Sequence, residues 1–157
     1  MGHLRSFYRN KRGQALIEFA FILPFLLVIV GGIVDFGLAF FIGQVIENAA
    51  REGARAGAVV RPAQGTHEFP EAEEGTCTVP CTSGPSILQV ASDKIPNVAL
   101  FGGFTLKSQF NDSSNNEDSI QVTVEGQYGW FLLQLLRFER ITISRTAEMR
   151  WEWQDPS

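Results

Sequence analysis

A long run of apolar residues constrains this chain more than any other feature of its sequence. Phe19–Val34 are sixteen uncharged, mostly apolar residues, and after Asp35 the run continues over Phe36–Gly43. About 20 apolar residues are enough for a helix to cross a bilayer, so residues 19–43 are predicted to span a membrane. One alternative is a buried core helix, but the remaining chain is too small to surround it on all sides. Another is a secretory signal peptide. An ordinary signal peptide has a shorter apolar region that is followed by a small-x-small cleavage site.

The charge is distributed unevenly along the chain. The first thirteen residues carry four bases and no acid, and the remaining residues carry 9 bases against 17 acids. A basic flank is retained in the cytoplasm, so the body beyond about residue 44 is predicted to lie outside the cytoplasmic membrane. Nucleic acid is not an expected partner, because its recognition needs a concentrated basic surface on the folded domain.

The chain length of 157 residues allows one membrane segment and one small soluble domain. We expect a basic leader over 1–13, a membrane helix with a soluble extension over 14–59, and a soluble domain over 60–157. The predicted fold class is α+β: a long N-terminal transmembrane α-helix that continues into a small soluble domain with an antiparallel sheet.

Small residues recur at every fourth position in the extension of the helix, namely at Ala49, Gly53 and Gly57. Each Gly costs about 1 kcal/mol relative to Ala inside a helix, so the stripe needs a packing reason. It lets another backbone approach closely. Two partners are open: the chain's own soluble domain, or neighbouring subunits.

The soluble domain shows a helix signal and several strand signals. Pro96 stops the helix, and the last strand alternates apolar and polar residues except at Arg145, which stands on the apolar face. Trp130–Phe138 is predicted to be a short amphipathic helix that either covers the sheet or rests on the membrane surface. The expected elements are an irregular connection over 62–85, a helix over 86–95, a strand over 105–110, a polar turn over 111–118, a strand over 120–124 and a strand over 141–153.

A cleavage motif precedes the apolar run. Basic residues are followed by Gly13, and Glu18 is the first acid of the following helix. A peptidase at the membrane surface needs a small residue at the scissile bond, so cleavage is predicted between Gly13 and Gln14. A carboxylate costs about 2.5 to 3.5 kcal/mol at the bilayer centre, so Glu18 is expected to have a partner, such as the new α-amino group of an adjacent subunit. Alternatively, Glu18 sits at the level of the lipid headgroups.

The stretch from Gly13 to Ala20, with Pro24, Gly32 and the segment 49–55, resembles the TadE-like pseudopilins of tight-adherence (Tad) pili, and Gly13 with Glu18 resembles the prepilin cleavage motif of type IV-like pilins. The closing segment 142–150 is similar to the family's final strand. The resemblance is specific over 13–58, weaker over 139–152 and absent between 60 and 118. The length of the chain favours a minor subunit over a major one.

The resemblance implies processing by a prepilin peptidase and a structural role in a pilus. The implied partners are other pilin subunits, that peptidase, the inner-membrane assembly platform and the lipid bilayer. The implied location is the cytoplasmic membrane, with the N-terminus cytoplasmic and the C-terminal domain periplasmic or extracellular, and also the pilus itself. An alternative with the same sequence features is a membrane-resident assembly accessory protein that does not enter the filament.

Two residues depart from a purely lipid-facing helix. Asp35 is an acid late in the span, tolerable near the outer interface and able to pair with a neighbour in a filament. Pro24 removes one helical hydrogen bond and is expected to kink or loosen the helix locally. Together with Glu18 and the small-residue stripe, these two residues are the expected positions of subunit assembly.

No catalytic constellation is recognisable, so a membrane-tethered enzyme or thiol carrier is disfavoured, and no cofactor or metal is expected. Cys77 and Cys81 lie too far apart in sequence for a C-x-x-C redox motif, and a disulfide between them is expected in an oxidising compartment. The acids Glu68, Glu71, Glu73 and Glu74 lack the regular ligand spacing of a calcium loop and are read as a solvated loop.

Overall fold

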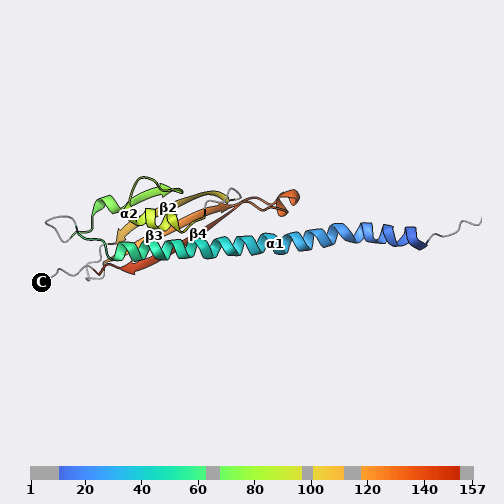
Figure 1. The fold of residues 1–157 in the computed structure, drawn as a ribbon, viewed down its shortest axis with the longest axis horizontal. Helices are drawn as coiled ribbons and strands as arrows, with labels where there is room; N and C mark the ends of the chain where they lie inside the picture. The colour runs from blue at the N-terminus through green and yellow to red at the C-terminus, as the bar shows by residue number, and fades with distance from the viewer. Residues whose placement is uncertain (1–10, 63–67, 97–100, 112–117, 153–157) are drawn as a thin grey trace, which may run out of the picture.

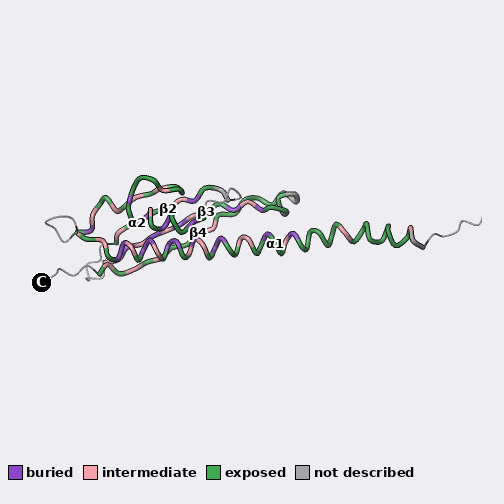
Figure 2. The backbone as a smooth tube through the Cα atoms, in the orientation of Figure 1, coloured by how far each residue is buried: buried purple, intermediate pink, exposed green. Residues whose placement is uncertain are grey.

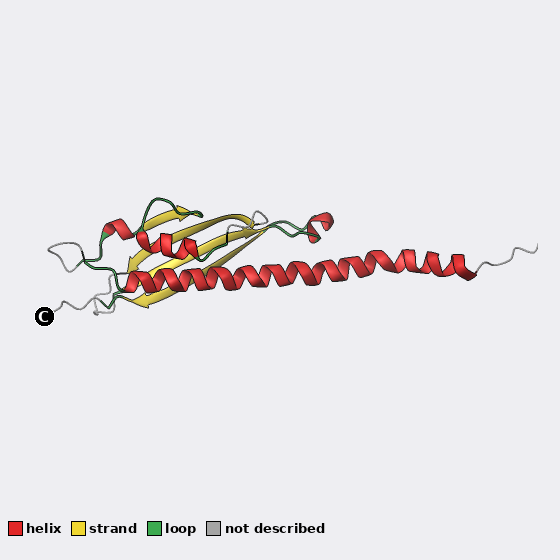
Figure 3. Cartoon of the chain, in the orientation of Figure 1, coloured by secondary structure: helices red, strands yellow, loops and turns green. Residues whose placement is uncertain are grey.

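The computed structural model describes residues 11–62, 68–96, 101–111 and 118–152. One long helix, α1, carries a small α+β domain along its C-terminal half (Figure 1, Figure 3). The elements in chain order are α1 (Lys11–Ala58), η1 (Glu71–Glu73), β1 (Gly75–Thr78), α2 (Ser86–Asp93), β2 (Phe101–Asn111), β3 (Ser119–Tyr128), η2 (Leu133–Leu136) and β4 (Ile141–Arg150). The predicted fold class is confirmed.

The helix α1 divides into a bare half, residues 13–30, and a covered half, residues 42–58, which packs on the domain (Figure 2). It runs without interruption through Pro24, and it is the helix among the described residues that is long and apolar enough to cross a membrane. Only 6% of its most apolar stretch is buried, and Phe21 and Phe25 are 72% and 73% exposed. A core helix of a soluble protein would bury these side chains, so the exposed apolar half fits a lipid environment instead.

The covered half of α1 packs on the domain through small side chains. Ala49, Ala50 and Ala54 are fully buried, and the two stripe glycines lie against the sheet and α2. A Cβ at Gly57 would lie 2.8 Å from Ile120 Cγ1, and one at Gly53 would lie 3.0 Å from the Ala91 Cβ. The small-residue stripe therefore packs on the chain's own domain, the first of its two possible partners.

The sheet is an antiparallel meander in the order β1-β2-β3-β4. Its apolar face points at α1. On this face lie alternate residues of β3, including Ile120, Val122 and Val124, which are fully buried. Register continues this face onto the neighbouring strands, since Val124 pairs with Leu106 on β2 and with Arg145 on β4. The alternation predicted for the last two strands is confirmed, but β4 ends at Arg150, short of the predicted end at residue 153, which lies outside the described residues.

The end of the domain farthest from the bare half is closed by hydrogen bonds and aromatic rings. Trp151 Nε1 donates to the carbonyl of Val60 at 2.9 Å, and the Glu152 N–H donates to that of Ala58 at 3.1 Å. The ring of Phe69 stacks on Phe110 at 4.7 Å, with Trp151 edge-on to both. These contacts fix the C-terminal end of β4 to the end of α1.

Two parts of the prediction for the soluble domain need correction. Residues 62–85 were expected to be irregular, but residues 75–78 form β1, an edge strand paired with β2. Four residues with one apolar member give no alternation to recognise. The helix predicted over 86–95 is confirmed as α2, and the strand predicted over 105–110 is longer, since β2 begins at Phe101. Most of the polar turn predicted over 111–118 lies outside the described residues.

The segment Trp130–Phe138 is not the amphipathic helix that its sequence predicts. Only Leu133–Leu136 are helical, as the short 3₁₀ helix η2. The segment lies in the connection between β3 and β4, residues 129–140, which we call the β3–β4 tip; it extends beyond the sheet toward the bare half of α1 (Figure 1). It therefore extends past the end of the sheet instead of covering it.

We predict that Gly57→Leu destabilises the docking of the domain on α1, since the added side chain collides with Ile120. Overpacking of a filled core costs about 1 to 3 kcal/mol. Thermal unfolding of the detergent-solubilised protein should show a lower midpoint. Gly37→Leu is the matched control, because a Cβ at Gly37 meets no atom within 4 Å. Equal midpoints for the two variants would contradict the packing described.

Candidate functional site

The most heavily bonded polar side chain at the boundary between the two halves of α1 is Asp35. Its carboxylate accepts hydrogen bonds from the backbone N–H groups of Phe131 at 2.9 Å, Leu132 at 3.0 Å and Leu133 at 2.8 Å. The Tyr128 hydroxyl donates to the Asp35 backbone carbonyl at 3.2 Å and lies 3.5 Å from the carboxylate. We call this set of bonds the Asp35 clasp. It joins the membrane helix to the β3–β4 tip.

The clasp provides hydrogen-bond partners both for the Asp35 carboxylate and for the backbone N–H groups of Phe131–Leu133. Asp35 is fully buried, and a buried carboxylate is costly unless hydrogen-bonded. Phe131–Leu133 are the residues that lead into η2, where backbone N–H groups have no partner within the helix. The negative charge at this helix start is favourable for the same reason. Burial, and then the charge of Asp35, raise the pKa of Tyr128, which therefore keeps its proton and remains a donor.

Aromatic side chains surround the clasp. Trp130 makes edge-on contacts with Phe36 of α1 and with Tyr128, each at a ring-centre distance of 5.4 Å. Its indole Nε1 donates to the carbonyl of Glu139 at 2.8 Å, which joins the two ends of the tip. Gly31 lies next to Leu132, with space for no side chain: a Cβ there would lie 2.8 Å from Leu132 Cδ1. The tip is thus seated on α1 over residues 31–36.

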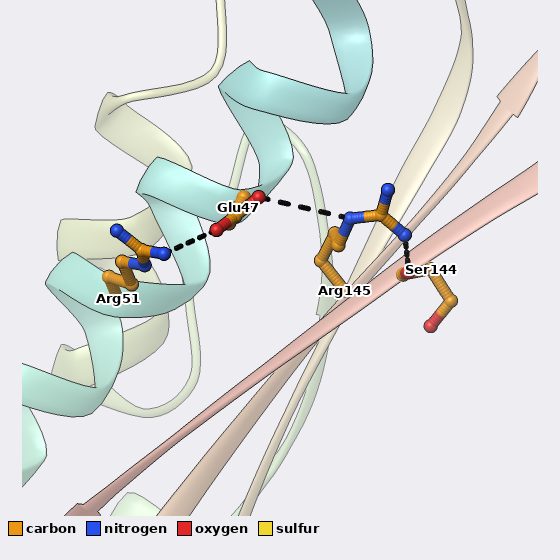
Figure 4. A network of polar contacts seen from close by, with 4 residues as sticks. All are labelled: Glu47, Arg51, Ser144 and Arg145. Atoms are coloured by element: carbon orange, nitrogen blue, oxygen red, sulfur yellow. Dashed lines mark hydrogen bonds and ion pairs between the residues drawn. The ribbon is translucent and has the colours of Figure 1, made fainter. Parts of the chain in front are cut away.

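A second polar link joins α1 to β4 (Figure 4). Glu47 pairs with Arg51 one turn along the helix, and its other oxygen lies 4.0 Å from Arg145 Nε on β4. Arg145 also donates to the Ser144 carbonyl at 3.0 Å. This accounts for the exception in the apolar alternation of β4, because Arg145 faces the helix. The side chains are partly exposed, so each pair contributes about 0 to 1 kcal/mol.

The residues of the predicted cleavage motif all lie on the bare half of α1. The helix begins at Lys11, and a Cβ at Gly13 would meet no atom within 4 Å. Gln14 Nε2 donates to Glu18 Oε1 at 3.2 Å, and both side chains are exposed. Pro24 is exposed as well. Glu18 therefore faces outward from the chain, in contrast to Asp35, which is bonded within it.

Cys77 and Cys81 form a disulfide, as expected. The bridged loop sits beside α2, where the Cys81 N–H donates to Ser92 Oγ at 3.0 Å, and beside β2, where the Val79 N–H donates to the Phe104 carbonyl at 3.0 Å. In the chain-entropy account, closing so short a loop contributes about 2 kcal/mol of stability. The bridge holds β1, the edge strand of the sheet.

Two of the four clustered acids serve as acceptors inside the domain. The Glu73 carboxylate accepts from Ser86 Oγ at 2.8 Å and from the Ile87 N–H at 3.2 Å, which caps the start of α2. Glu74 accepts from the Phe110 N–H at 2.6 Å. Among the residues that the structure describes, no three His, Cys, Asp or Glu side chains are grouped as metal ligands would be.

We predict that Asp35→Ala opens the β3–β4 tip. Three buried N–H groups lose their acceptor, and each buried unsatisfied group costs about 1 to 3 kcal/mol. Hydrogen exchange at the amides of residues 131–133 should quicken about tenfold or more. Gln14→Ala, on the same helix and distant from the tip, should leave these amides unchanged. Unaltered exchange in Asp35→Ala would show that the clasp does not hold the tip.

A family model described as TadE-like protein matches residues 13–55. No curated protein matches the chain, and no solved structure matches it. The matched range covers the bare half of α1 and nearly all of its covered half, including Glu18, Asp35 and two of the three stripe residues. The predicted resemblance is confirmed for this part of the molecule: residues 13–55 are similar to TadE-like proteins, and the sheet and α2 follow this segment in the chain.

Proposed function

We propose that this chain is a structural minor pilin or pseudopilin of a Tad-like pilus. A prepilin peptidase cleaves it after Gly13, and it joins other subunits through the hydrophobic half of α1. It acts by assembly and not by catalysis. Its partners are other pilin subunits, the peptidase, the inner-membrane assembly platform and the lipid bilayer, and the domain lies on the outer side of the cytoplasmic membrane or in the pilus.

The observation that supports this function best is the division of α1. Residues 14–30 expose apolar side chains around most of the helix, while residues 42–58 are covered on one face by the chain's own domain. A helix that served only to hold a domain on a membrane needs the same apolar half. The TadE-like match and the exposed acid Glu18 in that half favour packing against other helices as its second use.

The use of the small-residue stripe within the chain narrows the assembly surface. Ala49, Gly53 and Gly57 are buried under the domain and are unavailable to a neighbouring subunit. Asp35 is bonded to its own tip. Of the positions expected to serve assembly, Glu18 and Pro24 are the ones that are exposed, so subunit contacts are proposed at the bare half of α1.

The alternative function is a membrane-resident accessory protein that never enters the filament. Fractionation separates the two. Pili sheared from cells and cleared of membranes should contain this chain, at a low ratio to the major subunit. Its presence in membranes alone, with major pilin recovered normally in the sheared fraction, would favour the accessory role.

We predict that the mature protein begins at Gln14. N-terminal sequencing of the native protein should read Gln14 first, because Gly13 is small and unobstructed. Gly13→Leu should remain uncut, whereas the control Gly37→Leu should be processed normally. A native protein that keeps the residues before Gln14, or that begins beyond residue 40, would exclude the pilin interpretation.

We predict that Glu18→Ala preserves membrane insertion and processing but reduces co-purification with other pilins. An amine and a carboxylate attract strongly at low dielectric, and each is costly when left alone. Glu18→Gln keeps the size and the acceptor for Gln14 while removing the charge, so it should be impaired as well. Gln44→Ala, an exposed change on the same helix, is the control.

Undiminished assembly by fully processed Glu18→Ala would place Glu18 at the headgroup level with no role in assembly. Impairment of Glu18→Ala together with normal assembly of Glu18→Gln would show that a polar contact, and not charge, is what matters.

A further inference from the structure

The β3–β4 tip lies beside residues 31–35 of α1, close to the end of the apolar run that is long enough to cross a membrane. The clasp fixes the tip beside Asp35, and Leu132 packs on Gly31, one turn earlier in α1. A bilayer core of about 30 Å takes about 20 residues at 1.5 Å each. A span that starts at Gln14 ends near Ile33, and one that starts at Phe19 ends near Leu38. With the second start, residues 31–35 lie inside the hydrocarbon, and with the first, Asp35 lies two residues, about 3 Å, beyond its outer boundary.

The tip presents large apolar side chains at this height. Phe131 is 63% exposed, Leu132 43% and Phe138 54%. Phe36 of α1, against which the tip packs through Trp130, is also exposed, at 64%. Exposed aromatic and aliphatic side chains grouped together mark an interaction surface. Here the group is continuous with the apolar half of α1, whose exposed side chains face lipid.

The polar groups of the tip are arranged as an interfacial segment requires. Its backbone N–H groups at residues 131–133 are bonded to Asp35, so entering lipid leaves none of these three without an acceptor. The charged residues Arg137, Glu139 and Arg140 are exposed; they follow Phe131 and Leu132 in sequence and flank Phe138. Long Arg side chains reach from an apolar surface to the lipid phosphates.

We propose that the β3–β4 tip is a second membrane contact of this chain, inserted into the outer leaflet of the bilayer beside α1. Phe131, Leu132 and Phe138 enter the boundary between headgroups and acyl chains, and the Asp35 clasp holds them at that depth. The domain is then attached to the membrane at two places, which fixes its height and its rotation about α1. This holds whether or not the chain later enters a filament.

The test places a fluorescent thiol label at single positions of the full chain in lipid vesicles, at about one copy per vesicle. Both native cysteines are bonded to each other, so an introduced cysteine is the one free thiol. The tip variants are Phe131→Cys and Phe138→Cys. Phe25→Cys, in the bare half of α1, reports lipid, and Lys107→Cys, exposed on β2, reports water.

Labels at 131 and 138 should be quenched by nitroxide-labelled lipid to at least half the extent seen at 25, and iodide should quench them severalfold less than at 107. Asp35→Ala should reduce the lipid quenching at 131 but not at 25, because it releases the tip and leaves the span in place. That difference tests the clasp as the device that sets the depth.

Two results would overturn the proposal. Iodide quenching at 131 equal to that at 107 would place the tip in water. Protection from iodide without quenching by lipid nitroxide would mean that protein, and not lipid, covers the tip. Neither result bears on cleavage at Gly13 or on the presence of the chain in pili, so this proposal and the proposed function can fail separately.

Discussion

A carboxylate that lies on an apolar helix must find hydrogen-bond donors, and the way Asp35 finds them organises this molecule. Its donors come from a connection almost a hundred residues away in sequence, where the backbone of 131–133 turns into η2. Water could not serve as well, since Asp35 is fully buried. The bond set therefore fixes where the soluble domain sits along the helix, and with it which half of α1 stays bare.

The covered half of α1 packs on the domain through small side chains. Alanine and glycine at the positions that face the sheet let β3 approach the helix backbone, and Ile120 occupies the space that a larger residue at 57 would need. The bare half follows no such pattern and exposes Phe, Leu and Ile around most of its circumference. One continuous helix thus has two environments. Its covered half contacts the chain's own domain, and its bare half is suited to lipid or to other apolar helices.

Sequence reasoning predicts the features with a local signal. The apolar run, the four-residue spacing of 49, 53 and 57, and the alternation of the last two strands each correspond to an observed element. The strand β1 could not be predicted, because four residues at a sheet edge carry no period of their own. The partners of Asp35 could not be named either, because backbone N–H groups leave no mark in a sequence. Two residues nevertheless stand out in the sequence as exceptions to their patterns. Asp35 is an acid in an apolar run, and Arg145 lies on an apolar strand face, where it pairs with Glu47.

The β3–β4 tip is seated on α1 over residues 31–36, and a cysteine cross-link between the two tests this contact. The Cβ of a residue at 31 would lie 3.0 Å from the Cβ of Leu132, within a small adjustment of disulfide geometry, whereas a Cβ at Gly32 meets nothing within 4 Å. In native membranes under mild oxidation, Gly31→Cys combined with Leu132→Cys should form the bridge within one chain. Gly32→Cys combined with Leu132→Cys should not. Absence of the first bridge, or equal formation of both, would show that the tip is not seated on α1 at Gly31.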